Sequence, residues 1–355
     1  MSNQPSNKRA TLRDVAQKCN LSLATVSRVL SHSDYSVSEK TREQVLAAAK
    51  ALHYTPNALG RSLKTQNTRI IGVIIPNITN PYYAQLLLGI GDKTTQENYG
   101  LLMCNSHRSA EVENKGLEML ISERVAGILI VSIGSDSRLI EQALEMNIPV
   151  VTLEQKPANA LLQDCCHIGF DYAEGAKQAV DHLYHQGHRR IAFVGAPPVY
   201  HSRREMLAGY CSAIENNHLP LVDELIWLGT EESDTIHLYE LENGEACAQA
   251  LTQLNDPPTA YLCINDQSAI GLIRGLQMLG IRVPEDVSVM GFDNIPQGEL
   301  THPSLTTIDQ RAYEMGQLAV EELFKQIQDP DASIKSTMLK PTIIERDSVR
   351  QYPIK

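Results

Sequence analysis

Two short stretches of helical hydrophobic periodicity stand near the start of the chain. The first predicts a helix from Leu12 to about Cys19, where Thr11 has the side chain of an N-cap and Asp14 completes a capping box. After a connection of two residues, Ser22 is a second N-cap candidate. The helix that follows is predicted to bury Val26, Val29 and Leu30 on one face. Its other face exposes Leu23, Ala24, Thr25, Ser27 and Arg28.

A third amphipathic helix is predicted from an N-cap at Ser38 to Leu52. It ends before Pro56 because proline disfavours helical conformation in the residue that precedes it. Three short helices of this kind match a helix-turn-helix, whose second helix enters the major groove of DNA with its N-terminal residues against the base edges. Many small helical bundles share this outline, so the periodicity alone leaves the function open.

Beyond residue 69 the pattern changes to short β-branched runs that alternate with amphipathic helices. Such alternation predicts parallel, doubly wound sheets with right-handed crossovers. Eight strands between residues 70 and 292 favour two such sheets over one. The strands expected are Ile70–Pro76, Leu101–Asn105, Gly127–Val131, Val150–Leu153, Ile168–Phe170, Ile191–Gly195, Ala260–Asn265 and Val287–Phe292.

The distribution of charge also divides the chain, after residue 64. The formal net charge is −11, which as a single value disfavours a nucleic-acid partner. Residues 1–64, however, carry ten Lys or Arg and four Asp or Glu, a balance of +6, and the remainder carries −17. A basic segment on an acidic body indicates a polyanionic partner for the first segment alone. A solvated basic surface without a partner is the alternative that charge leaves open.

The string TLRDVAQKCNLSLATVSRVL, continued by VSEKTREQVLAAAKALHYTPNALGRSL, resembles the DNA-binding head of the lactose repressor and galactose repressor family of bacterial transcription regulators. The resemblance extends along nearly the whole chain. It implies an all-α helix-turn-helix head and an α/β effector domain of two doubly wound, periplasmic-binding-protein-like lobes. It also implies a repressor of sugar or related catabolic genes, a homodimer that binds a pseudo-palindromic double-stranded DNA operator under the control of a small-molecule effector.

Carried over position by position, the resemblance assigns base readout to Leu23, Ala24 and Arg28. The Arg28 guanidinium suits bidentate capture of guanine, whereas Leu23 and Ala24 can offer only apolar contact. Partial packing of Leu23 against the third helix is the alternative reading of that residue. Phosphate contacts, which orient the head but specify little sequence, are implied for Thr11, Ser22, Thr25, Ser27, Ser38, Thr41 and Asn57.

The resemblance makes residues 57–67 a hinge helix and linker, with Leu63 as a wedge in the minor groove. Gly60 replaces the alanine expected there, at a cost of about 1 kcal/mol in a helix interior. An ordinary linker is the alternative. The head is then expected at 1–56 and the body at 68–355. Within the body we expect an N-lobe of 68–183 and 310–329, a C-lobe of 184–309 and 330–355, and crossings near His182–Gln186, Ile308–Gln310 and Asp329–Pro330.

Ligands of open parallel sheets bind beyond the carboxyl ends of the strands, so residues just after each apolar run are expected to line a cleft. The carboxylates, amides and aromatic rings found there suit a sugar or a nucleoside. By resemblance, effector-contacting positions fall on Tyr83, Asp171, Asn265 and Asp293. Acids at strand ends also cap helices, and we expect that role for Asp266, before the helix Ser268 to Leu279, but not for Asp293.

One position departs from the family pattern. Met206 stands where the family has an arginine that grips the effector, and Arg203 and Arg204 in the previous turn are candidates to replace it. Two adjacent guanidinium groups suit a phosphate or a carboxylate, which adds sugar phosphates to the expected ligands. A solvated helix start is the alternative. The segment 228–243 is also longer and more acidic than the family's usual loop, which leaves the identity of the ligand open.

Two other classes of protein fit the sequence less well. A nucleotide-dependent enzyme is disfavoured because the chain has no GxGxxG motif in the required place and no GxxxxGK[ST], GxSxG or HExxH, so no catalytic residue, metal or cofactor is predicted. A periplasmic sugar-binding protein would need a signal peptide in place of the basic head. Seven scattered cysteines and the lack of a long apolar run favour a cytoplasmic protein without a membrane partner. The C-terminus lacks a leucine heptad, which disfavours a coiled-coil tetramer.

Overall fold

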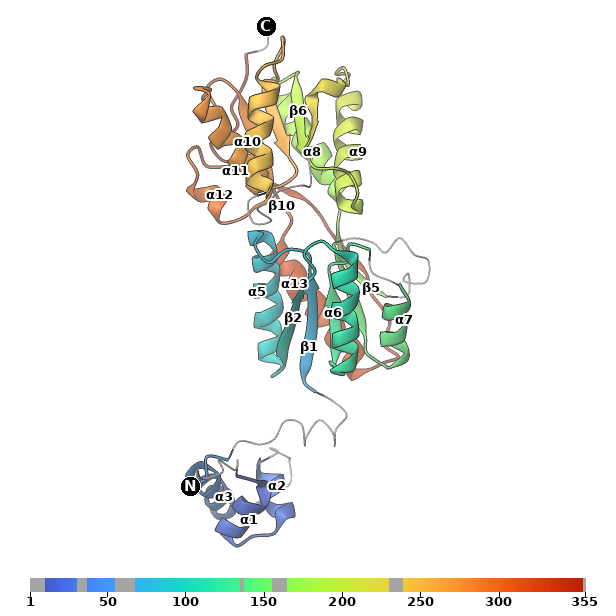
Figure 1. Cartoon of the computed structure of the whole chain (residues 1–355), viewed down its shortest axis with the longest axis vertical. Coiled ribbons are helices and arrows are strands. Elements are labelled where there is room, and N and C mark those ends of the chain that lie inside the picture. The colour runs from blue at the N-terminus through green and yellow to red at the C-terminus, as the bar shows by residue number, and fades with distance from the viewer. Residues whose placement is uncertain are drawn as a thin grey trace, which may run out of the picture. The chain divides into compact units, whose positions relative to one another are not determined.

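The computed structural model describes residues 10–30, 37–54, 68–134, 137–154, 165–229 and 239–353. Two compact units divide the chain, Met1–Thr68 and Arg69–Lys355. The described elements of the first unit are helices, and the second unit is an α/β body of two lobes (Figure 1).

The described part of the head contains three helices, α1 (Leu12–Cys19), α2 (Leu23–Leu30) and α3 (Glu39–Ala51). The predicted capping box of α1 is present: the Thr11 hydroxyl accepts a hydrogen bond from the Asp14 amide at 3.3 Å, and the Asp14 carboxylate accepts one from the Thr11 amide at 2.7 Å. The first helix of the head therefore begins where the sequence indicated.

Capping and a small apolar core hold these helices together. Ser22 accepts from the Thr25 amide at 3.1 Å and Ser38 from the Thr41 amide at 3.3 Å, which confirms both as N-cap side chains. Asn20, in the left-handed conformation with φ 51°, ends α1 and turns the chain toward α2. The buried residues of the core are Val15, Ala16, Cys19, Val26, Val29, Val45, Ala48 and Ala49.

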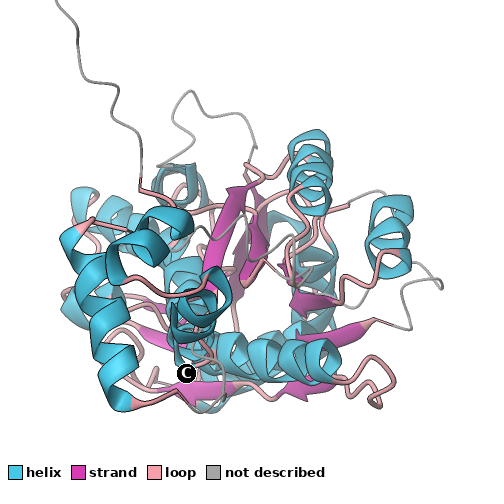
Figure 2. Cartoon of the chain, turned by 90° about the horizontal axis from the view of Figure 1, so that it is seen from below, coloured by secondary structure: helices cyan, strands magenta, loops and turns pink. Residues whose placement is uncertain are grey.

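The N-lobe of the body is a six-stranded parallel sheet in the order β11-β5-β4-β3-β1-β2, with helices on both faces (Figure 2). Helices α5 and α13 pack together on one face, and α6 and α7 pack on the other. The elements are β1 (Ile70–Ile75), α5 (Pro81–Gln96), β2 (Gly100–Asn105), α6 (Ala110–Ser122), β3 (Gly127–Ile130), α7 (Ser137–Glu145), β4 (Val150–Glu154), β5 (Cys166–Phe170), α13 (Ala312–Gln328) and β11 (Thr337–Leu339).

The C-lobe has a second six-stranded sheet, in the order β12-β10-β9-β8-β6-β7, in which only β12 is antiparallel to its neighbour. Helix α8 packs against α9, and α10 packs against α11. The elements are α8 (Tyr172–His185), β6 (Ile191–Gly195), α9 (His201–Asn216), η2 (Asp223–Leu225), β7 (Ile226–Leu228), α10 (Tyr239–Leu251), β8 (Ala260–Cys263), α11 (Asp266–Met278), β9 (Ser288–Asp293), α12 (Gln297–Leu300), β10 (Thr306–Asp309) and β12 (Thr342–Ile344).

This architecture confirms the predicted fold class, and each of the eight expected strands is present within two residues of its predicted ends. Four further strands, β7, β10, β11 and β12, were not predicted. They have three or four residues each, and β7, β11 and β12 lie at sheet edges, so they carry too few consecutive buried apolar positions to stand out in the sequence.

The chain crosses between the lobes at other places than the sequence suggested. Helix α8 packs on the C-lobe, so the first crossing is at Asp171 and not at His182–Gln186. The second is at Gln310–Arg311, close to the expected Ile308–Gln310. The third is at Lys340–Pro341 and not at Asp329–Pro330, because β11 adds an edge strand to the N-lobe sheet before the chain leaves it.

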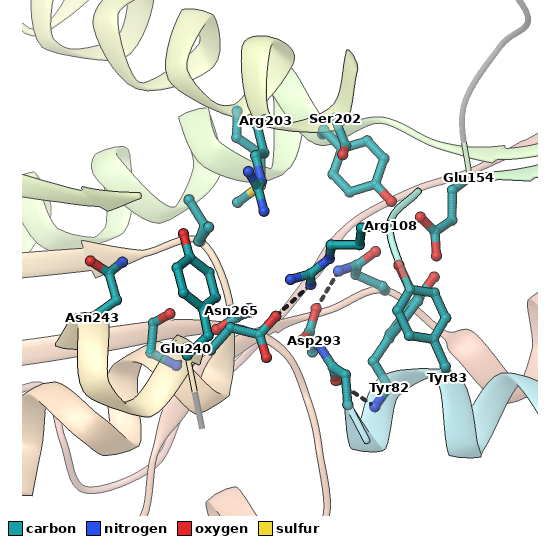
Figure 3. A pocket seen from close by; sticks show the side chains of 17 residues that line it. Tyr82, Tyr83, Arg108, Glu154, Ser202, Arg203, Glu240, Asn243, Asn265 and Asp293 are labelled. Carbon is teal, nitrogen blue, oxygen red and sulfur yellow. Dashed lines mark hydrogen bonds and ion pairs between the residues drawn. The ribbon is translucent and has the colours of Figure 1, made fainter. Parts of the chain in front are cut away.

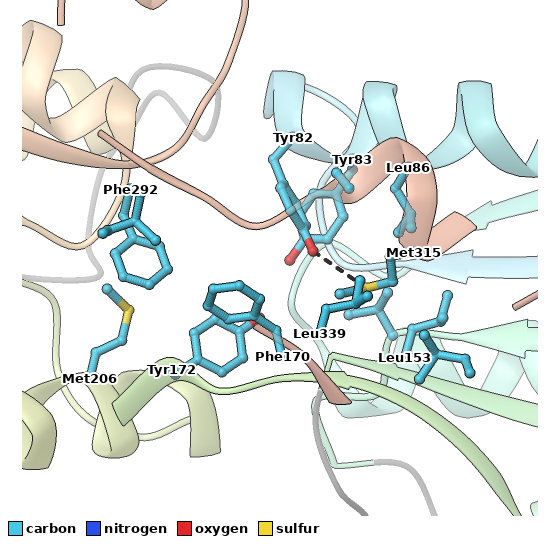
Figure 4. Packing of buried hydrophobic residues seen from close by; sticks show 14 of the residues in the cluster. Tyr82, Tyr83, Leu86, Leu153, Phe170, Tyr172, Met206, Phe292, Met315 and Leu339 are labelled. Carbon is cyan, nitrogen blue, oxygen red and sulfur yellow. Dashed lines mark hydrogen bonds between the residues drawn. The ribbon is translucent and has the colours of Figure 1, made fainter. Parts of the chain in front are cut away.

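One apolar cluster extends through both lobes beside the crossings. Phe170 at the end of β5 and Tyr172 at the start of α8 have ring centroids 5.2 Å apart, and Phe292 of β9 lies 5.8 Å from the first and 6.2 Å from the second (Figure 4). The lobes of the body therefore share buried aromatic surface as well as covalent connections.

Candidate functional site

The exposed face of α2 carries the three residues for which base readout is predicted. Leu23 is 47% exposed, which is unusual for a large apolar residue, and Ala24 and Arg28 are exposed beside it. Val26 and Val29 of the same helix are fully buried, so the helix has one packed and one open face. The open face of α2 therefore displays two apolar side chains and one guanidinium to solvent.

The hydroxyl residues predicted to hold phosphates cluster at helix starts. Ser22 and Thr25 at the start of α2 share a hydrogen bond of 2.8 Å between their hydroxyl groups, as do Ser38 and Thr41 at the start of α3. Amides at a helix N-terminus and adjacent hydroxyls are a usual binding site for a phosphate group. The exposed Thr11 and half-buried Ser27 complete the described part of this set, while Asn57, Leu63 and the whole segment 57–67 lie outside the described residues.

A pocket lies between the lobes of the body at the carboxyl ends of both sheets (Figure 3). Its cavity has a volume of about 90 Å³. The lining comes from both lobes and consists of Asn80, Tyr82, Tyr83, Arg108, Glu154, Tyr172, Ser202, Arg203, Met206, Tyr239, Glu240, Asn243, Ile264, Asn265, Ser268, Asp293 and Gln310.

Four of the six sequence-predicted effector residues line this pocket, namely Tyr83, Arg203, Asn265 and Asp293. The other two do not. The exposed Asp171 caps α8, where its carboxylate accepts from the Glu174 amide at 2.9 Å. The exposed Arg204 donates to the backbone oxygens of Pro198 at 3.3 Å and Val199 at 2.7 Å.

The expected capping role of Asp266 is wrong. Asn265 caps α11, since its side-chain oxygen accepts from the Ser268 amide at 2.8 Å. The fully buried Asp266 carboxylate turns to the opposite side and accepts from the Ile295 amide at 2.8 Å and the Thr307 hydroxyl at 2.5 Å. Asp266 thereby fixes the loop that follows β9, and burial raises its pKa to about 6.

Asp293, the last residue of β9, lines the pocket and is held in an unusual backbone conformation with φ 130°. One carboxylate oxygen accepts from the Gln310 side-chain amide at 2.5 Å, and the other, Oδ2, has no hydrogen-bond partner within the described part of the chain. Burial raises the pKa of Asp293, and the nearby carboxylates of Asp266, Glu240 and Glu154 raise it further. The pocket thus contains a desolvated acid with one oxygen available.

A second buried acid, which the sequence analysis missed, approaches from the N-lobe. Glu154 ends β4 with φ 64° and is 5% exposed. Burial raises the pKa of this carboxyl to about 7, although hydrogen bonds with Tyr82, Tyr172 and Tyr83 and the charge of Arg108 lower it. Its Oε1 atom has no partner among the described residues. Glu154 directly follows the predicted strand Val150–Leu153, so the expectation that residues just after each strand line the cleft applied to it as well.

An ion pair between the lobes borders the pocket, and the sequence analysis missed it too. Arg108 follows β2 in the N-lobe and donates to Glu240 of α10 in the C-lobe at 2.6 Å (Figure 3). The Tyr200 hydroxyl donates to the backbone oxygen of Arg108 at 3.2 Å, and Gln85 of α5 donates to the backbone oxygen of Asn294 at 3.2 Å. These three bonds define what we call the closed arrangement of the lobes.

The chain has a single tryptophan, Trp227, and it contacts Asn243 in the C-lobe wall of the pocket. Asn243 accepts from the Trp227 indole N–H at 2.9 Å and donates to the backbone oxygen of Gly195 at 2.9 Å. Beside it, the Arg203 guanidinium donates to the backbone oxygen of Pro197 at 3.1 Å and lies 4.7 Å from the centre of the Tyr200 ring. Trp227 is therefore placed to report changes in the pocket by its fluorescence.

The described ranges contain no group of three or more His, Cys, Asp or Glu arranged to hold a metal ion. No helix within them is both long enough and apolar enough to cross a membrane.

Comparison with known proteins gives consistent matches for both units. Residues 11–57 match the model of bacterial regulatory proteins of the lacI family, and residues 180–349 match a periplasmic binding protein-like domain. The HTH-type transcriptional repressor PurR of Mannheimia succiniciproducens is 31% identical over 344 residues, 96% of this chain and 99% of that protein. PurR of Vibrio parahaemolyticus is 33% identical over 347 residues, with coverage of 96% and 99%.

Solved structures show the same likeness. A lac repressor dimer bound to operator and the anti-inducer ONPF is 27% identical with a TM-score of 0.80, covering 97% of this chain and 100% of that one. A LacI family transcriptional regulator from Enterococcus faecium with bound ribose is 27% identical with a TM-score of 0.71, covering 80% and 100%.

A helix-turn-helix head and a two-lobed α/β body with a polar pocket between the lobes define a DNA-binding transcription regulator under small-molecule control. The chain belongs to the lacI family of bacterial regulatory proteins. It is a sequence-specific transcription repressor with a helix-turn-helix head and an effector-binding body.

Proposed function

We propose that the effector of this repressor binds in the pocket between the lobes and contacts Tyr83, Asn265 and Asp293, with Arg203 and Glu154 at its edges. The observation that supports this most strongly is the set of unpartnered acceptor oxygens in one cavity. Oδ2 of Asp293, Oε1 of Glu154 and Oε1 of Gln310 all lack a partner among the described residues. An unpaired buried polar atom costs roughly 1–3 kcal/mol, which a bound ligand recovers.

Effector binding in this pocket requires movement of the lobes. A cavity of about 90 Å³ is smaller than the roughly 300–1,000 Å³ of typical small-molecule sites. The Arg108–Glu240 pair and the two hydrogen bonds beside it must therefore open or rearrange for a ligand to enter. A ligand that binds the open and closed arrangements with different affinity shifts their ratio, which is the physical basis of allosteric control.

We propose that the head responds to this change in the lobes by a change in its binding to DNA. We propose base contacts by Leu23, Ala24 and Arg28 and phosphate contacts by the hydroxyl-rich starts of α2 and α3. Asn57 and Leu63 would add contacts from the segment that joins head and body. One head presents little surface, so a homodimer on a pseudo-palindromic operator is expected, as in the lac repressor dimer bound to operator.

The regulated genes and the cellular location follow from the same proposal. A sugar or nucleoside effector fits the acceptor-rich pocket and suggests control of catabolic genes. A repressor of chromosomal genes acts in the cytoplasm. We ascribe no catalytic step to the pocket, because its relatives are transcription regulators.

The test measures how effectors alter operator affinity. Duplexes selected from a random pool supply an operator, sugars and nucleosides are screened by Trp227 fluorescence, and fluorescence anisotropy gives operator affinity with and without the binding compound. We expect Asp293→Ala to lose the effector response and keep operator affinity. The matched control is Glu285→Ala, which removes an exposed acid of the same lobe. An Asp293→Ala protein with a response of normal size would contradict this assignment of the site.

A further inference from the structure

Acceptor oxygens predominate among the unpartnered atoms of the pocket between the lobes. Besides the Ser268 hydroxyl, which can both donate and accept, three of its buried oxygens lack partners within the described ranges, Oε1 of Glu154, Oδ2 of Asp293 and Oε1 of Gln310, and each of these three side chains is at most 5% exposed. All three are acceptors when the acids are ionised. A ligand that satisfies them must present donors from several directions.

The charges of the pocket point the same way. Three carboxylates line it, those of Glu154, Glu240 and Asp293, against the two guanidinium groups of Arg108 and Arg203. Arg108 is committed to Glu240 at 2.6 Å. Arg203 donates to a backbone oxygen at 3.1 Å and lies over an aromatic ring. With the cations engaged inside the protein, an anionic group on the ligand would face two uncompensated acids, which disfavours a sugar phosphate.

The backbone holds both uncompensated acids in place. Glu154 and Asp293 have φ values of 64° and 130°, in the region that residues with a side chain rarely adopt. Such conformations are energetically unfavourable for residues with a side chain and are found preferentially at functional sites. The acids come from different lobes, β4 and β9, so a group bound between them contacts both lobes at once.

We propose that the effector carries a protonated amine, which binds between Glu154 and Asp293, together with hydroxyl groups that reach the Gln310 oxygen. This inference rests on the proposed effector site and names the chemical class of its ligand. Ionic hydrogen bonds of this kind are roughly twice as strong as neutral ones. An ammonium group there also supplies the positive charge that two buried carboxylates need.

The binding test uses sugars with the same ring configuration that carry an ammonium, a neutral hydroxyl or a phosphate group. D-glucosamine, D-glucose and D-glucose 6-phosphate form one set, and the galactose and mannose equivalents form two more. Isothermal titration of the full-length protein measures the affinity of each compound. We expect at least one amino sugar to bind about tenfold or more tightly than its neutral and phosphorylated partners. A neutral or phosphorylated sugar that binds as tightly as the amine, or no binding by any amine, overturns the inference.

Proton release gives a second readout. An ammonium group lowers the pKa of a neighbouring carboxyl, and burial leaves that of Glu154 at about 7, with Tyr82, Tyr83, Tyr172 and Arg108 facing it. Burial raises the pKa of Asp293 as well, so binding of the amine near neutral pH should release protons from both carboxyls, measured by titration in buffers of different ionisation enthalpy. Neutral sugars should release none. Equal release by amine and neutral sugar would count against the inference.

Variants separate this inference from the proposed function. Glu154→Gln and Asp293→Asn keep the side-chain shape and should reduce the preference for the amine to less than threefold, whereas the exposed Glu285→Gln should preserve it. If a neutral sugar binds and changes operator affinity, the effector site stands and only the amine is refuted. If an amine binds but Asp293→Asn and Glu154→Gln leave its affinity unchanged, it binds elsewhere, and both the site and the inference fail.

Discussion

Replacing Glu240 by glutamine removes the negative partner from the Arg108–Glu240 pair that joins the lobes at 2.6 Å. The Arg108 guanidinium then stays largely desolvated without a counter-charge. Exposed pairs contribute about 0–1 kcal/mol, and loss of one partner from a buried pair costs about 3–5 kcal/mol. The side chains of Arg108 and Glu240 are 25% and 7% exposed, so an intermediate figure applies. We expect the closed arrangement to lose about 2–3 kcal/mol, a roughly 30- to 140-fold shift toward the open one.

Two measurements test this value on the full-length protein. Small-angle scattering should show a more open body for Glu240→Gln, and stopped-flow fluorescence of Trp227 should show faster ligand association, because opening must precede binding. A double variant, Arg108→Met with Glu240→Met, removes both charges and should recover much of the closure. Wild-type scattering and association rates for Glu240→Gln would refute the reasoning. A double variant as open as the single one would assign the effect to lost packing rather than to an unpaired charge.

Three further predictions concern the close helix packing, the head and pH. Gly89→Ala should destabilise the body by roughly 1–3 kcal/mol in denaturant titrations, since its Cβ would lie 2.0 Å from the Tyr313 backbone oxygen. In the same helix, Gly91→Ala meets nothing nearer than 3.8 Å and should stabilise by about 1 kcal/mol; equal effects would be inconsistent with this packing. Arg28→Ala should cost about 1–3 kcal/mol of operator discrimination by anisotropy while weak binding to random DNA persists, and an equal loss on both would remove its base-reading role. Burial lowers the pKa of His188 to about 4 against about 6.5 when unfolded. The folded state thus binds fewer protons, and its stability, complete above pH 6.5, falls by up to about 3 kcal/mol toward pH 4. The melting temperature of His188→Gln should change less between pH 4 and pH 6.5 than that of the wild type. Parallel plots of melting temperature against pH would contradict the lowered pKa of His188.

The strands that could be predicted are those with a continuous apolar run in the sequence. The strand β3, for example, is fully buried over Gly127–Ile130, and its apolar run is visible in the sequence. The strand β11 has one buried residue of three, and β10 has a single large apolar residue, Ile308. These short strands owe their pairing to neighbours already in place, which no local pattern records. The third crossing was misplaced for the same reason, because it depends on β11.

The candidate site was predictable where it depends on one strand end and not where it depends on two lobes. Asn265 and Asp293 lie at the carboxyl ends of β8 and β9, and the rule for parallel sheets places such residues at the pocket. Arg108 and Glu240 are 132 residues apart, and only the folded arrangement of the lobes brings them together. Asp171 ends a strand as well, but its carboxylate caps α8 at a crossing and does not face the cavity.

The aromatic contact of Phe170, Tyr172 and Phe292 gives the body a fulcrum. It lies beside a chain crossing and contains no charged group to be exchanged for water, so it can remain packed while the ion pair at the pocket separates. If the lobes rotate about these packed rings, a small displacement at the ligand becomes a larger displacement at the end of each lobe that is farthest from the rings. Substitutions at Phe170 and Phe292, which do not line the pocket, would then change the amplitude of the regulatory response without removing a pocket residue, so sensitivity and specificity could be adjusted separately.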